Sequence, residues 1–323
     1  MKSSAWRWRW LALTAGAAAA LPLVVRGEYA LGLVTGIAIN TIVVLGLNLL
    51  MGYAGQVSLG QAAFVGIGAY TAAILATRHG VSPWLALVAG VALSALVAGI
   101  VGMPLLKLRG HYLAMGTLGL GIIVQTVMMQ WDGLTGGTTG IMSIPPLAIA
   151  GHQFEGGQMY YPAAAFMLLA LLLASNIIAS RVGRAMRAVH GSEVAAETAG
   201  VDTGRYKLQV FMLSGAFAGL AGALYAYHAS YIVCDTFGFH YSIQLVVMTV
   251  LGGMTSIWGA ALGAAAVTLI GEYLRAYQEY STIIFGSVLV LVMLFFPEGI
   301  WRGILRAVAR LAGLVRRGRP QEA

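Results

Sequence analysis

The chain has 323 residues, of which 59% are hydrophobic and only 9% charged, and its mean hydropathy is +0.83. An ordinary soluble domain is about one quarter charged, so this composition excludes a soluble globular fold, and the same hydrophobicity excludes disorder. The apolar runs are continuous rather than alternating, which favours membrane-spanning helices over the strands of a membrane barrel. We therefore expect an all-α, polytopic membrane helical bundle.

The apolar runs predict about ten spans within a single transmembrane domain, residues 1–323. The eighth run is short for a full crossing. The first has the basic start and Ala-rich centre of a signal peptide, but Pro22 and the apolar residues after it prolong the run, so we interpret it as a retained helix. The approximate ranges are 10–26, 29–51, 57–77, 84–106, 111–131, 160–179, 208–232, 242–255, 257–275 and 282–301.

The net charge of +8 is distributed as in a membrane protein rather than a nucleic-acid-binding one. If both termini are cytoplasmic, 16 of the 19 Lys and Arg fall in inner segments, which include the loop 180–207 and the basic tail 302–323. Because cytoplasmic segments are enriched in Lys and Arg, this bias predicts that orientation and an extracytoplasmic loop at 132–159. Gly and Pro in that loop indicate turns, either of a surface connector or of an outer lid or docking rim for a delivery protein.

Catalytic motifs are absent from the sequence. It contains no phosphate-binding loop, no nucleophile elbow and no zinc-binding His pair, and its six histidines lack ligand spacing. We expect no catalytic residue, no metal and no cofactor, and the single Cys234 excludes an intrachain disulfide. Glu272 lies one turn from Arg275 and is expected to pair with it. The scarcity of carboxylates at mid-depth disfavours a proton- or ion-coupled transporter.

Glycine is abundant, at 43 residues, and its spacing carries two predictions. Pairs four residues apart predict close helix packing, and they are Gly32/Gly36, Gly215/Gly219 and Gly259/Gly263. Two uncharged Gly-rich segments, 52–61 and 252–259, fall at inner turns. They are either tight interhelical turns or irregular backbone buried beside a translocation path. The candidate path residues are Gly55, Gln56, Ser58, Gln61, Gly253 and Ser256.

The inner loop 180–207 carries five basic and three acidic residues. Within it, Ala185 to Ala199 contains no Pro and one Gly, and Gly200 follows as a natural C-terminal stop. The pattern predicts a short helix outside the membrane.

Several of these segments together resemble the branched-chain amino acid ABC permease family, more closely its M-type (LivM-like) subunits than their H-type partners. The resemblance covers about residues 29–301 in consistent order. It implies an ABC importer permease fold with a cytoplasmic coupling helix, in the bacterial inner membrane. The stretches that carry it are 52–64, 66–70, 183–189, 193–201, 206–208, 214–226, 251–259 and 296–300.

The resemblance also implies a function and partners. The chain would be one of two permease subunits that form the path for branched-chain or related hydrophobic amino acids. The implied partners are an H-type (LivH-like) permease, two cytoplasmic ATP-binding subunits and an extracytoplasmic solute-binding protein. Because relatives also carry urea, amides or other small solutes, a different small solute is an alternative. A self-contained secondary transporter and a membrane-embedded enzyme or scaffold are further alternatives.

The loop 180–207 matches the coupling region of that family, and a short basic helix suits docking into a groove on a soluble partner. The sequence departs from the family at His190, Gly191 and Ser192, where a charged pair is more usual. Gly191 also weakens a helix by about 1 kcal/mol relative to Ala. The implied coupling residues are Arg184, Arg187, Glu193, Ala195, Ala196, Glu197 and Gly200.

Overall fold

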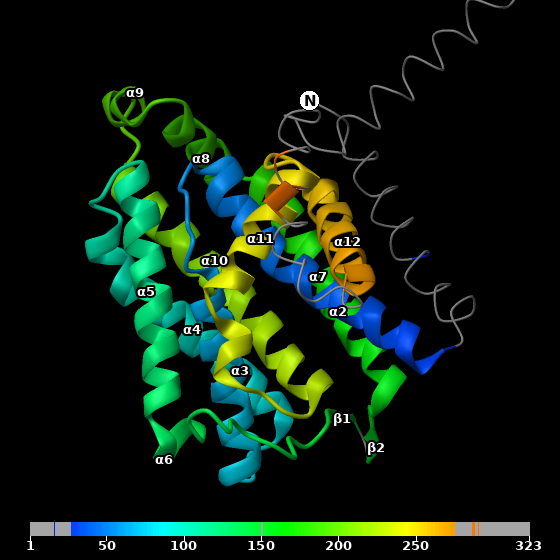
Figure 1. The fold of residues 1–323 in the computed structure, drawn as a ribbon. Helices are drawn as coiled ribbons and strands as arrows, with labels where there is room; N and C mark the ends of the chain where they lie inside the picture. Colours follow the sequence, from blue (N-terminus) through cyan, green and yellow to red (C-terminus); the bar gives the residue numbers. More distant parts are fainter. Residues whose placement is uncertain (1–15, 17–26, 150, 275–285, 288–289, 291–323) are drawn as a thin grey trace, which may run out of the picture.

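The computed structural model describes residues 27–149 and 151–274, together with 16, 286, 287 and 290. Nearly all of the first and tenth predicted spans lies outside these residues, as do the basic tail and Arg275. The described chain is a bundle of long helices with one two-stranded hairpin (Figure 1). The prediction of an all-α membrane bundle is confirmed for this part of the chain.

The long helices follow the predicted spans along the described chain. Each of the eight predicted spans between residues 29 and 275 coincides with a helix, although the third begins only at Gln61. These helices are α2 (Glu28–Leu47), α3 (Gln61–Arg78), α4 (Pro83–Leu105), α5 (His111–Gln130), α7 (Tyr160–Ala179), α10 (Thr203–Ala229), α11 (Phe239–Gly252) and α12 (Ile257–Leu274).

Shorter elements connect them. They are the π-helix η1 (Asn48–Tyr53), α6 (Asp132–Thr135), the strands β1 (Ala148–Ile149) and β2 (His152–Gln153), η2 (Gly156–Met159), α8 (Arg181–Gly191), α9 (Glu193–Thr198) and η3 (Cys234–Phe237). The strands pair antiparallel, with Ala148 opposite Gln153.

Six segments of the described residues are long and apolar enough to cross a bilayer. They are Glu28–Tyr53, Pro83–Leu105, His111–Gln130, Gly156–Ala179, Thr203–Ala229 and Ile257–Leu274. The helix α3 is less apolar than these, and α11 is a shorter apolar helix. The chain is therefore a multi-pass integral membrane protein.

Small residues allow α10 to lie against α3 and α4 at the centre of the bundle. A Cβ atom on Gly219 would lie 2.5 Å from Ser94 Oγ, and one on Gly215 would lie 2.7 Å from Ala98 Cβ. The helices α11 and α12 pack in the same way, since a Cβ on Gly259 would lie 2.0 Å from the Gly252 carbonyl oxygen. Close packing is confirmed at these two glycine pairs.

The third glycine pair behaves differently. Among the described residues, a Cβ on Gly36 would meet no atom within 4 Å, and one on Gly32 would meet only the His228 ring, at 3.8 Å. In the part of the chain that the structure describes, this pair brings no two helices into close contact. Both glycines instead border a cavity between α2, α10, α11 and α12.

The turns between helices gather at two ends of the bundle (Figure 1). One end, which we call the inner end, holds α8, α9 and the turns at 106–110 and 253–256, and the segment 54–60 runs from this end into the bundle, where Gly60 lies against Thr117 of α5. Direct contacts join these segments, as described below. The segments predicted to be external lie together at the opposite, outer end. The alternation of inner and outer turns along the chain follows the pattern expected from the basic residues.

The loop 132–159 is folded onto the outer end of the bundle. The Ala148 carbonyl accepts a hydrogen bond from Trp84 Nε1 at 2.7 Å. The backbone of Ile141 exchanges hydrogen bonds of 3.0 and 2.9 Å with Ile232, beyond the end of α10. Leu147 is fully buried. These contacts hold the described part of the loop against the ends of α4 and α10.

Candidate functional site

The first inner turn begins with a change in helix type. At Asn48 the chain leaves α2 and enters the π-helix η1, and beyond it the backbone runs without helix from Gly55 to Gly60. π-Helical turns are rare and frequently mark functional sites. Nothing in the sequence of this segment distinguishes a π-helix from an ordinary α-helical turn.

The two Gly-rich segments meet at η1. The Asn48 amide donates hydrogen bonds to the carbonyls of Gly253 at 3.3 Å and Ser256 at 3.0 Å. The Tyr53 hydroxyl donates to the Thr255 carbonyl at 2.7 Å. Gly253 has φ +104°, which favours glycine, and lets the chain turn sharply between α11 and α12. Two segments 200 residues apart in sequence thus form one junction at the inner end.

The segment Gly55–Gly60 is enclosed by other helices. The Leu59 amide donates a 3.0 Å hydrogen bond to Thr117 on α5, and the Gln61 side chain donates to the Ser214 hydroxyl on α10 at 2.9 Å. Gln56, Ser58 and Gln61 are all buried. The side-chain polar atoms of Gln56 and Ser58 have no hydrogen-bond partner among the described residues. Polar groups left unsatisfied in this way are costly, so they are unusual in a purely structural turn.

The inner loop 180–207 contains two helices rather than the single one predicted from Ala185 to Ala199. Ser192 separates α8 from α9, and its hydroxyl accepts a 3.3 Å hydrogen bond from the Ala195 amide as the N-cap of α9. Ser180 caps α8 in the same way. A serine at this position favours a helix start over helix continuation, which explains the break. We call α8 and α9 together the helical hairpin. Gly200, with φ +80°, ends it as expected.

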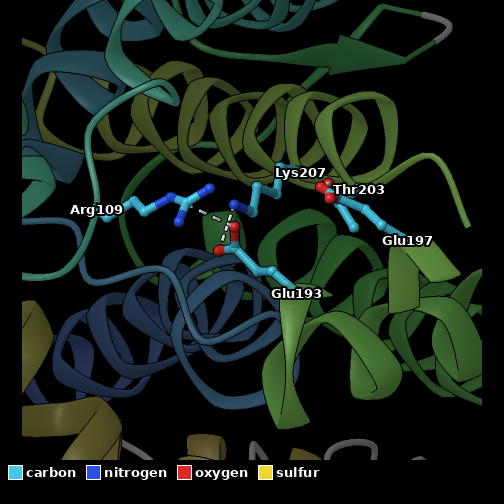
Figure 2. A network of polar contacts seen from close by, with 5 residues as sticks. All are labelled: Arg109, Glu193, Glu197, Thr203 and Lys207. Carbon is cyan, nitrogen blue, oxygen red and sulfur yellow. Dashed lines mark hydrogen bonds and ion pairs between the residues drawn. The ribbon is translucent and has the colours of Figure 1, made fainter. Parts of the chain in front are cut away.

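An ion-pair network anchors the hairpin to the bundle (Figure 2). Glu193, at the start of α9, pairs with Lys207 on α10 and lies 3.8 Å from Arg109, in the turn between α4 and α5. The Lys207 side chain is only 10% exposed, whereas that of Arg109 is 77% exposed. Glu197 accepts a 2.7 Å hydrogen bond from the Thr203 hydroxyl. Glu193 and Glu197 therefore hold the hairpin in place.

The other residues of the predicted coupling set divide by burial. Ala196 is the buried residue of α9, so its side chain faces the rest of this subunit and not a partner. Met186 and Val189 turn the apolar side of α8 inward. The residues left on the surface are Arg184, Arg187, Ala195 and Gly200, together with Glu197.

The hairpin touches the Gly55–Gly60 segment directly. A Cβ on Gly55 would lie 3.1 Å from Nδ1 of His190, at the end of α8. Gln56, Arg109, Glu193 and Lys207 line one small cavity of about 40 Å³. The predicted path segment and the predicted coupling loop are thus in contact. Local sequence patterns do not predict this contact, because it joins residues more than 130 positions apart.

The fold and site define a class of protein. Apolar crossing helices, a junction of broken backbone and a basic hairpin at one end are the features of a membrane permease component. The chain matches the family model described as branched-chain amino acid transport system / permease component over residues 29–296. The protein belongs to this family.

Individual relatives agree with the family match. The chain is 34% identical over 308 residues to a high-affinity branched-chain amino acid transport system permease protein LivM from Salmonella typhimurium, covering 88% of this chain and 72% of the relative. The LivM protein of Escherichia coli is 33% identical over the same shares.

Proteins named LivH are also related to the chain. One from Methanocaldococcus jannaschii is 25% identical, covering 84% of this chain and 92% of the relative. No solved structure matches the chain significantly.

Proposed function

We propose that the protein is the M-type permease subunit of an ABC importer for branched-chain or related hydrophobic amino acids. The observation that carries this proposal is the family match over residues 29–296, together with LivM proteins that match 88% of the chain. The relatives are transport permeases, so the protein is a transporter component and not an enzyme. Its proposed partner subunit is a LivH-like permease. This is supported by the similarity of this chain to proteins named LivH.

The hairpin α8–α9 is the proposed docking element for two cytoplasmic ATP-binding subunits. Its outer surface carries Arg184 and Arg187 on α8, and Ala195 beside them on α9 is exposed and small enough for close approach. Glu193, Ala196, Glu197 and Gly200 shape the hairpin rather than meeting the partner. A short element fixed by ion pairs transmits the movement of a docked subunit better than a loose loop does.

The Gly55–Gly60 segment and the Gly253 turn form the proposed inner gate of the translocation path. Gln56, Ser58 and Gln61 bring polar groups to a non-helical segment, and Gly253 and Ser256 accept the hydrogen bonds that join the two turns. Contact between His190 and Gly55 links this gate to the docking element. Docking and opening are then mechanically connected within one subunit.

The orientation follows from the same proposal. The inner end lies in the cytoplasm with both termini, in the bacterial inner membrane, in a bundle of about ten helices. The loop 132–159 faces outward, where an extracytoplasmic solute-binding protein delivers the solute.

The experiment is solute uptake by the reconstituted complex of this chain with its LivH-like, ATP-binding and solute-binding partners. Radiolabelled leucine, isoleucine and valine are compared with urea and acetamide, with and without ATP. We expect ATP-dependent uptake of the aliphatic amino acids that is at least tenfold faster than uptake of urea or acetamide.

Two other outcomes would contradict this proposal in different ways. Uptake of urea or acetamide alone would support an ABC importer but contradict amino acids as its solute. Leucine uptake by this chain without ATP or partners would identify a secondary transporter instead.

A further inference from the structure

A large cavity opens in the outer half of the bundle, away from the inner gate. It has a volume of about 450 Å³ and lies between α2, α10, η3, α11 and α12. Small-molecule sites in proteins span about 300–1,000 Å³ and combine apolar walls with a few convergent polar groups. Leu33, Ile39 and Phe237 contribute apolar surface here, and Gly32 and Gly36 leave α2 bare on this side.

Polar groups from three helices converge in this cavity. Asn40 lies near the middle of the segment Glu28–Tyr53, accepts a 2.8 Å hydrogen bond from the Tyr241 hydroxyl, and donates one of 3.1 Å to the Thr268 hydroxyl. Toward the outer end, Glu272 accepts a hydrogen bond from the Tyr29 hydroxyl. Polar and ionisable side chains that face the interior of a membrane bundle frequently mark solute pathways.

A second cavity continues toward the outer surface. It has a volume of about 200 Å³ and lies under the folded loop, where Pro146, Phe154 and Glu155 line it. His228 lines both cavities, and its buried Nδ1 has no hydrogen-bond partner among the described residues. An unpartnered ring nitrogen between two cavities is suited to a ligand that passes from one to the other.

We propose that the cavity between α2, α10, α11 and α12 is a binding chamber for a zwitterionic amino acid, entered under the outer loop past His228. The apolar walls take the aliphatic side chain. The second N–H of the Asn40 amide and the Thr268 hydroxyl offer hydrogen bonds to the carboxylate, and Glu272 offers an acceptor to the ammonium group. This inference rests on the proposed function. It adds a solute-binding site on α2, separate from the inner gate at Gly55–Gly60 and Gly253.

The test fills the chamber from Gly36. A Cβ there would meet no atom of the described residues within 4 Å, so Gly36→Leu adds volume without a clash against their backbone. In the reconstituted complex we expect leucine uptake to fall at least tenfold, while uptake across the series alanine, valine and leucine shifts in favour of the smaller solutes. The matched control is Gly119→Leu on α5, where a Cβ also meets nothing within 4 Å and which lies outside the cavity.

A chemical measurement serves as a second readout. In a Cys234→Ala background, Gly36→Cys is exposed to a water-soluble maleimide in the assembled complex, with leucine at millimolar concentration as the probe. We expect labelling from the outer side that leucine slows at least threefold.

Wild-type uptake and solute order in Gly36→Leu would overturn the inference while leaving the proposed function intact. Labelling of Gly36→Cys only by a lipid-soluble maleimide would overturn it too, because the cavity would then hold an acyl chain. Absence of leucine uptake by the wild-type complex is the separate failure of the proposed function.

Discussion

Among the described charged residues of the inner end, Lys207 has the least exposed side chain. Its ammonium lies against Glu193, and the side chain is only 10% exposed. A carboxylate that neutralises a nearly buried lysine stabilises more than a surface pair does, because its removal leaves the cation unpaired. Glu193 thus has a structural task inside the chain, and its substitution alone does not report on docking.

We predict that Glu193→Gln destabilises the protein by about 1–3 kcal/mol, between the values for surface and buried pairs. Thermal unfolding in detergent measures the change. Lys207→Met, which removes the unpaired charge, should restore most of the loss when combined with Glu193→Gln. Arg109→Gln is the control, and its effect should stay under about 1 kcal/mol because Arg109 is exposed. Equal losses in Glu193→Gln and Arg109→Gln would contradict this account.

Gly200 and Gly191 offer a second comparison, between two glycines of the same hairpin. Neither has an atom within 4 Å of an added Cβ, but Gly200 has φ +80° and Gly191 ends α8. Because the left-handed region costs an ordinary residue about 1 kcal/mol, Gly200→Ala should lower the melting temperature. Gly191→Ala should raise it or leave it unchanged. The idea fails if both substitutions act in the same direction.

Among the elements, α8 and α9 show how a basic loop becomes a fixed surface. The N-caps at Ser180 and Ser192 set the two helix starts, and the ion pair of Glu193 holds the hairpin against α10. Arg184 and Arg187 on α8 are exposed, and no hydrogen bond or ion pair joins their side chains to the described residues. They are the residues through which docking can be tested without disturbing the fold.

The double variant Arg184→Glu with Arg187→Glu should therefore lose the ATP-binding subunits while the permease pair stays assembled. Co-purification of those subunits and transport-stimulated ATP turnover measure the effect, and we expect each to fall at least fivefold. Arg205→Glu, an exposed arginine on α10 beyond the hairpin, is the matched control. Unchanged co-purification in the double variant would remove the hairpin from the docking surface.

The non-helical segment between η1 and α3 carries a prediction of its own. Ser58 is buried with an unpartnered hydroxyl, whereas Val57 beside it is 40% exposed. Ser58→Leu should lower uptake at least tenfold with normal subunit assembly, since the larger side chain blocks the gate. Val57→Leu should behave as wild type. Normal uptake in Ser58→Leu would leave the segment as a turn only.

For the whole molecule, orientation is the property to test. The Gly137 position is unsuitable for a cysteine probe, because its added Cβ would lie 1.8 Å from Asp132 Oδ1. Thr138 is exposed in the same loop, and Ala188 is exposed on α8. In a Cys234→Ala background, a membrane-impermeant maleimide on intact cells should label Thr138→Cys and reach Ala188→Cys only after permeabilisation. The reverse pattern would invert the topology.

The sequence predicts the helices of this molecule better than it predicts their contacts. Continuous apolar runs determine where helices cross, so eight spans are found within a few residues. The break at Ser192 was missed because a serine caps one helix and is tolerated inside another. Glu193 pairs with Lys207 on another helix, α10, and the cavity at Gly36 depends on the helices packed against α2. Neither feature can be predicted from the sequence pattern of a single segment.

The length of α11 bears on how membrane voltage acts on the protein. Fourteen residues of α-helix extend about 21 Å, less than the roughly 30 Å of a hydrocarbon core. Water in the cavity beside η3 would make the insulating layer thinner there, so that the voltage would fall mainly between the cavity and the Gly253 turn. Each net charge crossing 100 mV exchanges about 2.3 kcal/mol with that field, whereas a zwitterion exchanges almost none. A thinner layer makes the field across it steeper but leaves this energy difference between neutral and charged solutes unchanged, because the total voltage is the same.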